Sequence, residues 1–324
     1  MAETPGSFGN LGPLLVTDET RYRRGIIYGL AAYALWGAVP LFWPLVKRAG
    51  ALEILAHRVV WSLVVCVILL LTVVPRGWWS RIGQRRSLIM LGAAAAVVSV
   101  NWGVYIWAVN HGHVVETSLG YYINPIFSIL FGVILLRERL APLQWVSVGL
   151  AAVAVVVLTI DYGRLPWIAL TLATSFATYG LLKKRVNGGA VETMTVESAL
   201  LTPVALGYLI SLQSAGSLTF GHLGWSHNLL LIATGLITVV PLLFFASATT
   251  RLPLSTLGLL QYLAPTLQFL LGVLYFGETM SVGRWIGFGL VWVALVILTA
   301  YGLRRAQLNR RAVPSSDLSG VAGV

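Results

Sequence analysis

Charged residues are scarce in this chain of 324 amino acids: they make up 10% of it, whereas hydrophobic residues make up 57%. A soluble domain usually contains about 25% charged residues. The deficit excludes a soluble protein, because no soluble core buries this much apolar surface. Cysteine is also scarce. The single cysteine, Cys66, lies inside an apolar run, which excludes a disulfide framework and a thiolate metal site.

The sequence also lacks the motifs of catalysis and nucleotide binding. It contains no H-E-x-x-H, no Walker A loop, no G-x-S-x-G and no cluster of Cys and His with metal-ligand spacing. We therefore expect no cofactor, no metal and no enzyme, and we keep a membrane-embedded enzyme or lipid-modifying protein without a recognisable motif as the alternative function. The polar residues are scattered along apolar runs, unlike the pore loops and charged rings of channels. No loop is long enough for the ligand-binding domain of a receptor.

What the chain does have is a series of apolar runs long enough to cross a bilayer as helices, which takes ~20 residues each. Ten such runs fill nearly the whole chain: 25–46, 52–74, 87–109, 114–136, 143–160, 165–182, 193–212, 228–250, 253–276 and 283–303. They predict an all-α integral membrane protein with ten transmembrane helices in the plasma (inner) membrane. We expect a cytoplasmic tail at 1–24 and a disordered cytoplasmic tail at 304–324.

The net charge of +11 is concentrated on one side of the predicted membrane protein. If the N-terminus is inside, the inner segments hold 17 of the 22 Lys and Arg residues, the outer loops hold four, and Arg58 lies within a span. This asymmetry predicts that both termini are cytoplasmic. Basic inner loops suit anionic lipid, so the charge implies no nucleic-acid partner.

The chain contains an internal duplication. Residues 122–159 align without a gap with residues 262–299, and the identical positions include Pro125/Pro265 and Glu138/Glu278. We therefore divide the chain into two five-helix repeats at 25–160 and 165–303. An odd number of spans in each unit puts the two copies in opposite orientations. Many secondary transporters have this inverted-repeat plan and bind their substrate near the midplane between the repeats.

Four stretches carry a family resemblance: EILAHRVVWS, NWGVYIWAVNHGHVVETSLGYYINP, RERLAPLQW and PLLFFASATTRLPLSTLGLLQYLAPTLQF. Each repeat also has a Pro-containing helix, then G-x-x-x-x-x-E, then a helix rich in Trp and Gly. These features resemble RarD-type members of the EamA family, in the drug/metabolite transporter superfamily, which are often labelled chloramphenicol-sensitive proteins. The resemblance covers nearly the whole chain except the tails. It implies a ten-helix inner-membrane transporter and leaves the substrate open.

Polar residues form a stripe on the predicted fourth span, where Thr117, Tyr121, Asn124 and Ser128 follow helical spacing. The position 140 residues after Tyr121 is Gln261, so the second repeat has a related stripe. Matched stripes favour two walls of a shared cavity for an amphipathic or aromatic solute. The predicted cavity residues are Trp36, Asn101, Trp102, Tyr105, Tyr121, Asn124, Phe245, Gln261 and Tyr262. Alternatively, the polar groups join helices, and the Trp and Tyr rings mark the membrane interface.

The second span carries Glu53, His57 and Arg58 near its outer end. A charge at mid-bilayer costs ~2.5–3.5 kcal/mol on insertion scales, so Arg58 needs a partner. Glu116, a carbonyl freed by a proline, or an anionic group of the substrate would serve. We keep three hypotheses for this gating or coupling group: structural pairing of Arg58, contact with substrate or gate, and proton coupling through Glu53, His57 or Glu116.

Three further features have a structural and a functional interpretation. Pro125 and Pro265 bend their helices, either as hinges or as static kinks. Glu138 and Glu278 are expected to accept amide hydrogens at helix N-termini. The small-residue pairs Gly25/Gly29 and Gly283/Gly287 would permit a homodimer or packing within the chain equally well.

These observations predict a secondary transporter, and specifically an exporter. Its substrates would be small organic solutes such as amino-acid-like metabolites or aromatic drugs. Transport would proceed by alternating access between the inverted repeats, driven by protons or by the solute gradient.

Overall fold

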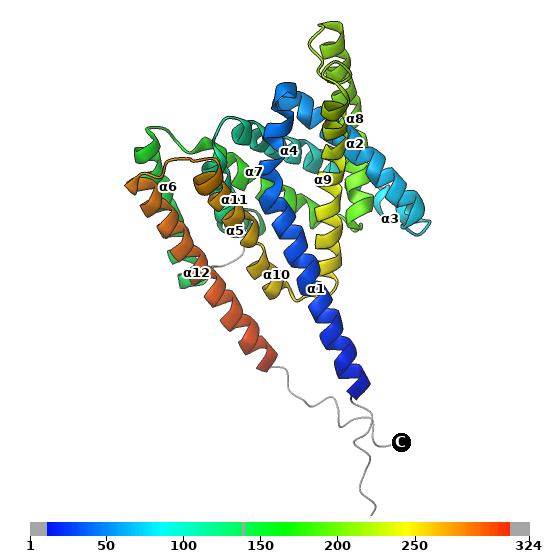
Figure 1. The fold of residues 1–324 in the computed structure, drawn as a ribbon. Helices are drawn as coiled ribbons and strands as arrows, with labels where there is room; N and C mark the ends of the chain where they lie inside the picture. The colour runs from blue at the N-terminus through cyan, green and yellow to red at the C-terminus, as the bar shows by residue number, and fades with distance from the viewer. Residues whose placement is uncertain (1–11, 138–139, 312–324) are drawn as a thin grey trace, which may run out of the picture.

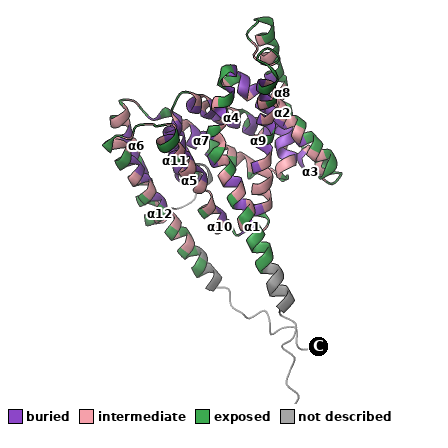
Figure 2. Ribbon diagram, in the orientation of Figure 1, coloured by how far each residue is buried: buried purple, intermediate pink, exposed green. Residues whose placement is uncertain are grey.

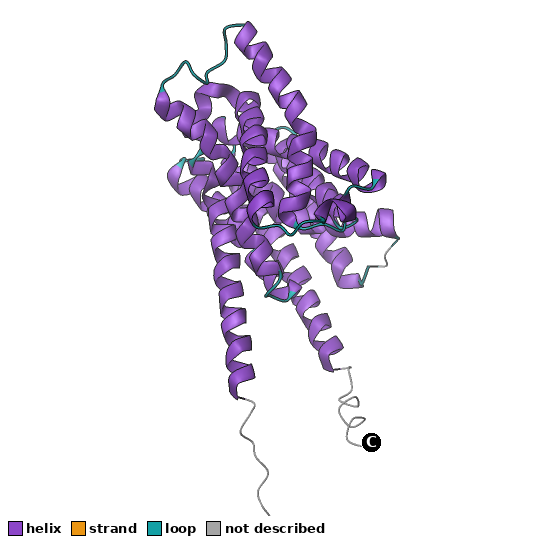
Figure 3. Ribbon diagram, turned by 90° about the vertical axis from the view of Figure 1, so that its right-hand side faces the viewer, coloured by secondary structure: helices purple, strands orange, loops and turns teal. Residues whose placement is uncertain are grey.

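The computed structural model describes residues 12–137 and 140–311, and these residues form helices joined by short loops (Figures 1 and 3). The helices are α1 (Gly12–Ala38), α2 (Gly50–Thr72), α3 (Trp78–Ile82), α4 (Arg85–Asn110), α5 (Val114–Leu136), α6 (Pro142–Tyr162), α7 (Trp167–Lys183), α8 (Ala190–Ser214), α9 (Trp225–Thr249), α10 (Leu254–Leu260), α11 (Leu263–Leu270) and α12 (Val282–Arg311). Two 3-10 segments, η1 (Val39–Leu41) and η2 (Trp43–Ala49), join α1 to α2, and the π-helical turn Leu271–Tyr275 continues α11.

Eight helical segments among the described residues are long and apolar enough to span a membrane: Trp43–Thr72, Arg85–Asn110, Val114–Ile134, Pro142–Tyr162, Ala190–Ser214, Trp225–Thr249, Thr256–Tyr275 and Val282–Arg305. The prediction of an all-helical membrane protein is confirmed. Two of the ten predicted spans, those in α1 and α7, do not meet these criteria. The α-helix α1 ends at Ala38, where Pro40 and Pro44 introduce 3-10 turns. Helix α7 has 17 residues, fewer than the usual ~20 of a span.

The helix boundaries repeat along the chain. Each of four helices in the first half begins 140 residues before a helix of the second half, at Gly50 and Ala190, Arg85 and Trp225, Val114 and Leu254, and Pro142 and Val282. One pair differs internally. Helix α5 is continuous through Pro125, whereas its counterpart is divided into α10 and α11 just before Pro265. A proline at 265 cannot donate a hydrogen bond to the carbonyl of Gln261, the residue that directly follows α10.

The packing of the helices is paired in the same way. Helix α6 packs on its counterpart α12, and α2 packs on its counterpart α8. Gly283 at the start of α12 contacts Asp161 near the end of α6, while Gly287 contacts Leu158. These two helices therefore run antiparallel, side by side (Figure 1). The contacts of α1 with α9 and α11 likewise have counterparts in the contacts of α7 with α4 and α5.

Helices α2 and α8 also run antiparallel. Cys66 near the end of α2 packs with Met194 near the start of α8, and Ala56 near the start of α2 packs with Ala205 farther along α8. The first turns of α1 and the last turns of α12 extend from the same end of the bundle (Figures 1 and 3). The α6–α12 contact and the α2–α8 contact thus each join a helix of the first half to the equivalent helix of the second half.

Many residues along the helices are exposed (Figure 2), and a large number of them are hydrophobic, as expected for contact with lipid. Leu71, Ile160 and Val204 are all more than 70% exposed on helices long enough to span a membrane. A soluble monomer rarely exposes continuous apolar surface of this kind. The core instead holds rings and branched chains such as Trp43 and Phe288, which are fully buried.

The tails differ in extent from the sequence prediction. Helix α1 already begins at Gly12, within the predicted tail 1–24, and α12 continues to Arg311, into the region 304–324 that was expected to be disordered. Arginine and glutamine favour helices, which accounts for the extension of α12 beyond its apolar part. Residues 1–11 and 312–324 lie outside the described residues.

Candidate functional site

Arg58 lies roughly two turns into α2 and is 9% exposed. Its Nε donates a hydrogen bond of 2.8 Å to the hydroxyl of Thr238 on α9. The guanidinium carbon lies 3.9 Å from the centre of the Trp102 ring and 5.6 Å from that of Trp43. No carboxylate forms an ion pair with Arg58 within the part of the chain that the structure describes. A buried charge is therefore held by one hydroxyl and by ring faces.

Two tyrosines complete the surroundings of this guanidinium. The rings of Tyr105 and Tyr121 lie 5.7 Å apart, and both phenols lie near Arg58. The hydroxyl of Tyr121 donates to Asn101 Oδ1 at 3.2 Å. The hydroxyl of Tyr105 is buried and has no partner. Helices α2, α4, α5 and α9 and the segment η2 together supply this group, which we call the Arg58 cluster: Trp43, Arg58, Trp102, Tyr105, Tyr121 and Thr238.

Asn101 has a joining role in this arrangement. Its Nδ2 donates to the carbonyl of Leu172 at 3.0 Å and to the hydroxyl of Ser175 at 2.9 Å, both on α7, while its Oδ1 accepts from Tyr121 on α5. The amide thus ties α4 to α5 and α7, as polar side chains commonly do between membrane helices. Its contacts match the helix-joining alternative that the sequence left open.

The remaining predicted cavity residues do not form a single group. Trp36 on α1 and Phe245 on α9 pack together with ring centres 5.7 Å apart. Asn124 is half-buried on α5, and its Oδ1 is buried without a partner. Gln261 donates to the carbonyl of Gly258 in the preceding helix, and Tyr262 lies with its hydroxyl 3.4 Å from that of Thr299 on α12. No contact among the described residues links Gln261 or Tyr262 to the Arg58 cluster.

A buried polar residue that the sequence did not single out for the cavity lies near Trp36. Gln268 is 3% exposed and donates through Nε2 to the carbonyl of Trp36 at 3.2 Å, while its Oε1 has no partner. Gln268 follows Gln261 at helical spacing in the polar stripe of the second repeat, and this spacing could have identified it from the sequence.

Glu53 anchors the loop between α8 and α9. Its Oε1 accepts from the hydroxyl of Thr219 at 2.7 Å, from the backbone N–H of Thr219 at 2.9 Å and from that of Phe220 at 3.2 Å. The ring of His57 packs at a tilt against Phe220 with centres 4.8 Å apart, and its Nε2 lies 3.9 Å from Glu53. Glu53 and His57 therefore contact this loop, whereas Arg58 points to the Trp102 side.

Glu116, one of the partners expected for Arg58, pairs instead with Arg164 at 2.7 Å and accepts the backbone N–H of Ile168 at 3.2 Å. Glu278 plays a similar part at the start of α5, where it accepts the N–H groups of Val114 and Val115. Burial raises the pKa of Glu278, and these two amides oppose that rise. The helix-capping role expected for Glu278 thus applies to a helix of the other repeat. Glu138 lies outside the described residues.

The glycine pairs considered for a homodimer are covered within the chain. A side chain at Gly25 or Gly29 would collide with Leu252 or Leu260, and one at Gly283 or Gly287 would collide with α6. Close helix packing inside the molecule accounts for these small residues.

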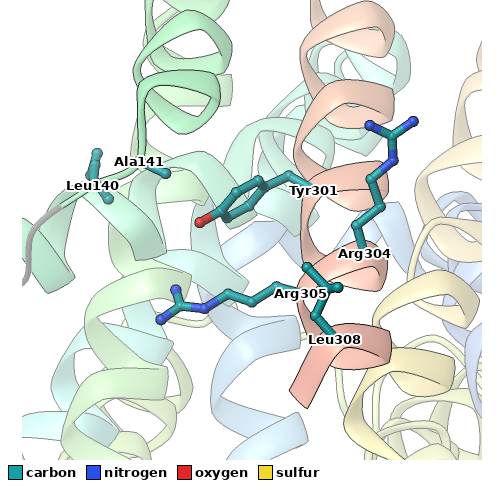
Figure 4. A pocket seen from close by; sticks show the side chains of 6 residues that line it. All are labelled: Leu140, Ala141, Tyr301, Arg304, Arg305 and Leu308. Carbon is teal, nitrogen blue, oxygen red and sulfur yellow. The ribbon is translucent and has the colours of Figure 1, made fainter. Parts of the chain in front are cut away.

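Three clefts at the surface lie on the side that carries the basic segments, and none is lined by a predicted cavity residue. One of about 550 Å³ lies between the start of α6 and the end of α12 (Figure 4). Its lining residues are Leu140, Ala141, Tyr301, Arg304, Arg305 and Leu308. Tyr301 and Arg305 point toward α6, whereas Arg304 points away, so the two arginines do not converge (Figure 4). No group of three or more His, Cys, Asp or Glu able to hold a metal occurs in residues 12–137 and 140–311.

Comparisons with known proteins agree with this architecture. The sequence profile of the EamA-like transporter family matches residues 23–160 and 165–300. A protein RarD of Streptomyces exfoliatus is 57% identical, with 90% of this chain and 93% of the relative covered. A protein RarD of Escherichia coli is 43% identical over 86% and 95%. An uncharacterized transporter of Pseudomonas aeruginosa is 41% identical over 85% and 93%.

A solved crystal structure shares the fold, with a TM-score of 0.53 and 19% identity over 86% of this chain and 98% of the other. The two matched segments coincide with the two halves whose helix starts repeat, and the relatives are bacterial proteins, several of them named as transporters. A small-molecule substrate and a lipid bilayer are therefore its partners, and the enzyme alternative is set aside. The chain belongs to the EamA-like transporter family and is a multi-pass membrane protein.

Proposed function

We propose that the protein is a secondary transporter that exports small organic solutes by alternating access between two inverted five-helix repeats. The observation that carries the proposal is the antiparallel packing of equivalent helices, α6 on α12 and α2 on α8. Two halves related in this way can exchange conformations, so that one side of the membrane opens as the other closes. The repeats would comprise residues 25–160 and 165–303, with α1 and α7 as the first span of each.

Both termini would be cytoplasmic, and an even number of spans would follow. In support, the first turns of α1 and the last turns of α12 lie at the same end of the bundle (Figure 1), and most Lys and Arg residues belong to segments predicted to face the cytoplasm. Thiol labelling tests this orientation. In a Cys66→Ala background, a membrane-impermeant reagent added to intact cells should modify Ser217→Cys but not Ser80→Cys. Labelling of Ser80→Cys before the cells are permeabilised would overturn the orientation.

The solute would pass between the aromatic residues of the two halves. Trp36 and Phe245 pack against each other in this conformation, so entry requires them to separate. The division of α10 from α11 before Pro265 supports a hinge at that site, with Pro125 as its counterpart. Proton coupling through Glu53, His57 or Glu116, and a homodimer, both stay untested.

Transport itself is tested by counterflow. The purified protein is placed in liposomes preloaded with one member of a panel of amino acids, their derivatives and aromatic drugs, and uptake of the labelled compound is followed. We expect counterflow with at least one class and none in protein-free liposomes. No counterflow with any compound, together with a lipid-modifying activity, would favour the membrane-embedded enzyme.

A further inference from the structure

The Arg58 cluster has more hydrogen-bond donors than acceptors. An arginine stays protonated at physiological pH and carries five N–H donors. Thr238 accepts from Nε, and no described residue forms an ion pair with the two terminal nitrogens. The indole Nε1 of Trp43 and the hydroxyl of Tyr105 are buried and have no partner either. An indole nitrogen can only donate.

Such an imbalance is costly inside a protein. A buried charge normally requires a counter-ion, and a buried donor normally requires an acceptor. The face of Trp102, 3.9 Å from the guanidinium carbon, attracts the cation but supplies no acceptor atom. The two carboxylates of the predicted gating group have other partners, because Glu53 is bound to the loop at Thr219 and Glu116 is bound to Arg164. No carboxylate among the described residues therefore supplies the counter-ion of Arg58.

The geometry also defines what kind of anion fits. A guanidinium binds a carboxylate through two parallel N–H donors, and one guanidinium matches one such group. Phosphorylated or multiply charged solutes would need further cations, and no Lys or second Arg belongs to the cluster. The rings of Trp43 and Trp102 lie against the charge, and those of Tyr105 and Tyr121 pack on each other. Their flat apolar surface suits an aromatic or apolar body.

The two halves of the molecule differ at this point. The position equivalent to Arg58, 140 residues later, is Ser198 on α8, a neutral residue. The cationic site therefore exists once and belongs to the first repeat, so it does not arise from the duplication alone. Arg58 lies roughly two turns inside α2, away from the exposed arginines of the loops.

We propose that Arg58 is the anion receptor of the transport pathway and that the solute is an organic monocarboxylate with an aromatic or apolar body. The terminal nitrogens of Arg58 bind the carboxylate, with Trp43 and Tyr105 as additional donors, and Trp102 holds the guanidinium in place. This inference rests on the proposed function, and it names the substrate class of the same pathway.

Ligand binding to the purified protein in a neutral detergent without added lipid tests the inference. The probes are two matched pairs, benzoate with benzamide and indole-3-acetate with indole-3-acetamide, and the readout is thermal stabilisation of the protein as a function of probe concentration. We expect the carboxylates to bind at least tenfold more tightly than the amides. Arg58→Gln should abolish this difference, and Arg58→Lys should keep part of it, because an ammonium retains the charge but not the paired donors.

Two further variants make the result decisive. Arg48→Gln removes an exposed arginine of η2 and should leave the preference unchanged. Tyr105→Phe removes one donor while keeping the ring, and should weaken only the carboxylates, by about three- to tenfold, even if Arg58→Gln fails to fold. Equal binding of carboxylates and amides to the wild type, or a full preference retained in folded Arg58→Gln, would overturn the inference.

Counterflow with the same probes separates this inference from the proposed function. Binding of carboxylates that depends on Arg58, without counterflow, would refute transport and leave the site standing. Counterflow of neutral solutes at an equal rate in wild type and Arg58→Gln would refute the site and leave transport standing. Loss of the carboxylate preference when phosphatidylglycerol is added would show that a lipid headgroup takes the site, and would overturn the assignment to the solute.

Discussion

Two buried charges on equivalent helices, Arg58 on α2 and Glu197 on α8, have opposite surroundings. Glu197 is 3% exposed and accepts from Nζ of Lys183 at 2.7 Å and from the hydroxyl of Tyr179 at 3.1 Å. Arg58 is 9% exposed and has one hydroxyl and two ring faces, but no carboxylate among the described residues. Burial alone does not distinguish the two roles. The partners of a buried charge indicate whether it stabilises the fold or is available to bind a ligand.

Three other carboxylates resemble Glu197, because each of them also has partners inside the chain. Glu53 binds the loop at Thr219, Glu116 binds Arg164 and the start of α7, and Glu278 binds the start of α5. Carboxylates at helix N-termini also interact favourably with the helix dipole. Arg58 thus differs from the buried acids of the described residues, which all have partners inside the chain.

The largest effect on stability is expected from breaking the pair on the second repeat. Lys183→Met leaves Glu197 buried without its cation, and removing one partner of a buried pair costs about 3 kcal/mol of unfolding free energy. The Lys183→Met/Glu197→Gln double variant should recover much of this loss. Denaturant unfolding of the purified protein measures both. A wild-type midpoint in Lys183→Met would mean that Glu197 does not depend on Lys183.

A smaller loss is expected from Glu116→Gln. The carboxylate is 2% exposed but its partner Arg164 is partly exposed, so the loss should be about 2 kcal/mol. This variant also separates two hypotheses for Glu116. A structural role predicts lower stability with an unchanged pH profile of transport, measured in liposomes between pH 5 and 8. A shifted profile at unchanged stability would identify Glu116 as a coupling residue, with Arg284→Gln as a control on the same side.

Several of these features could be predicted from the sequence, and others could not. The duplication predicts the repeated helix starts, and the scarcity of charge predicts a membrane protein. The sequence also shows that Arg58 is a charge inside a predicted span. It does not reveal the partner of Glu197, because Lys183 belongs to a basic segment that was assigned to a cytoplasmic loop. Glu53 was expected near the surface, and only the fold shows that the loop at Thr219 covers it.

The two prolines show a second limit of the sequence. Pro125 and Pro265 are equivalent by the duplication, yet α5 continues through the first and the helix divides before the second. A missing amide hydrogen bond weakens the helix at both sites, and the neighbouring helices decide whether it breaks. Likewise, the stripe predicts that Asn124 and Gln261 face one cavity. Gln261 donates to the carbonyl of Gly258 in the preceding helix, a contact that the stripe does not predict, and the shared cavity stays a prediction.

The pH dependence of the unfolding free energy tests Glu278, a carboxylate that has hydrogen-bond partners inside the chain. Burial raises the pKa of Glu278, so the folded protein binds this proton more tightly than the unfolded chain does. The unfolding free energy therefore falls as the pH rises from 4.5, the ordinary pKa of a glutamate, through the raised pKa of Glu278. The stabilisation from the proton is complete only below pH 4.5. Glu278→Gln should remove this slope, an effect of about 1 kcal/mol at most. Identical slopes for variant and wild type would exclude Glu278 as its source.

The smallest change in stability is expected from Arg58→Met, although it removes a charge from the middle of a helix. Because the charge has no carboxylate to leave behind, its replacement by an apolar side chain of similar length should alter the unfolding free energy by less than about 1 kcal/mol. The same variant should lose binding of carboxylates. Denaturant unfolding and ligand stabilisation, measured on one preparation, check both expectations. A loss of several kcal/mol, comparable to that of Lys183→Met, would show that Arg58 is a structural charge. A stable variant that no longer binds carboxylates would show that Arg58 serves binding and not stability.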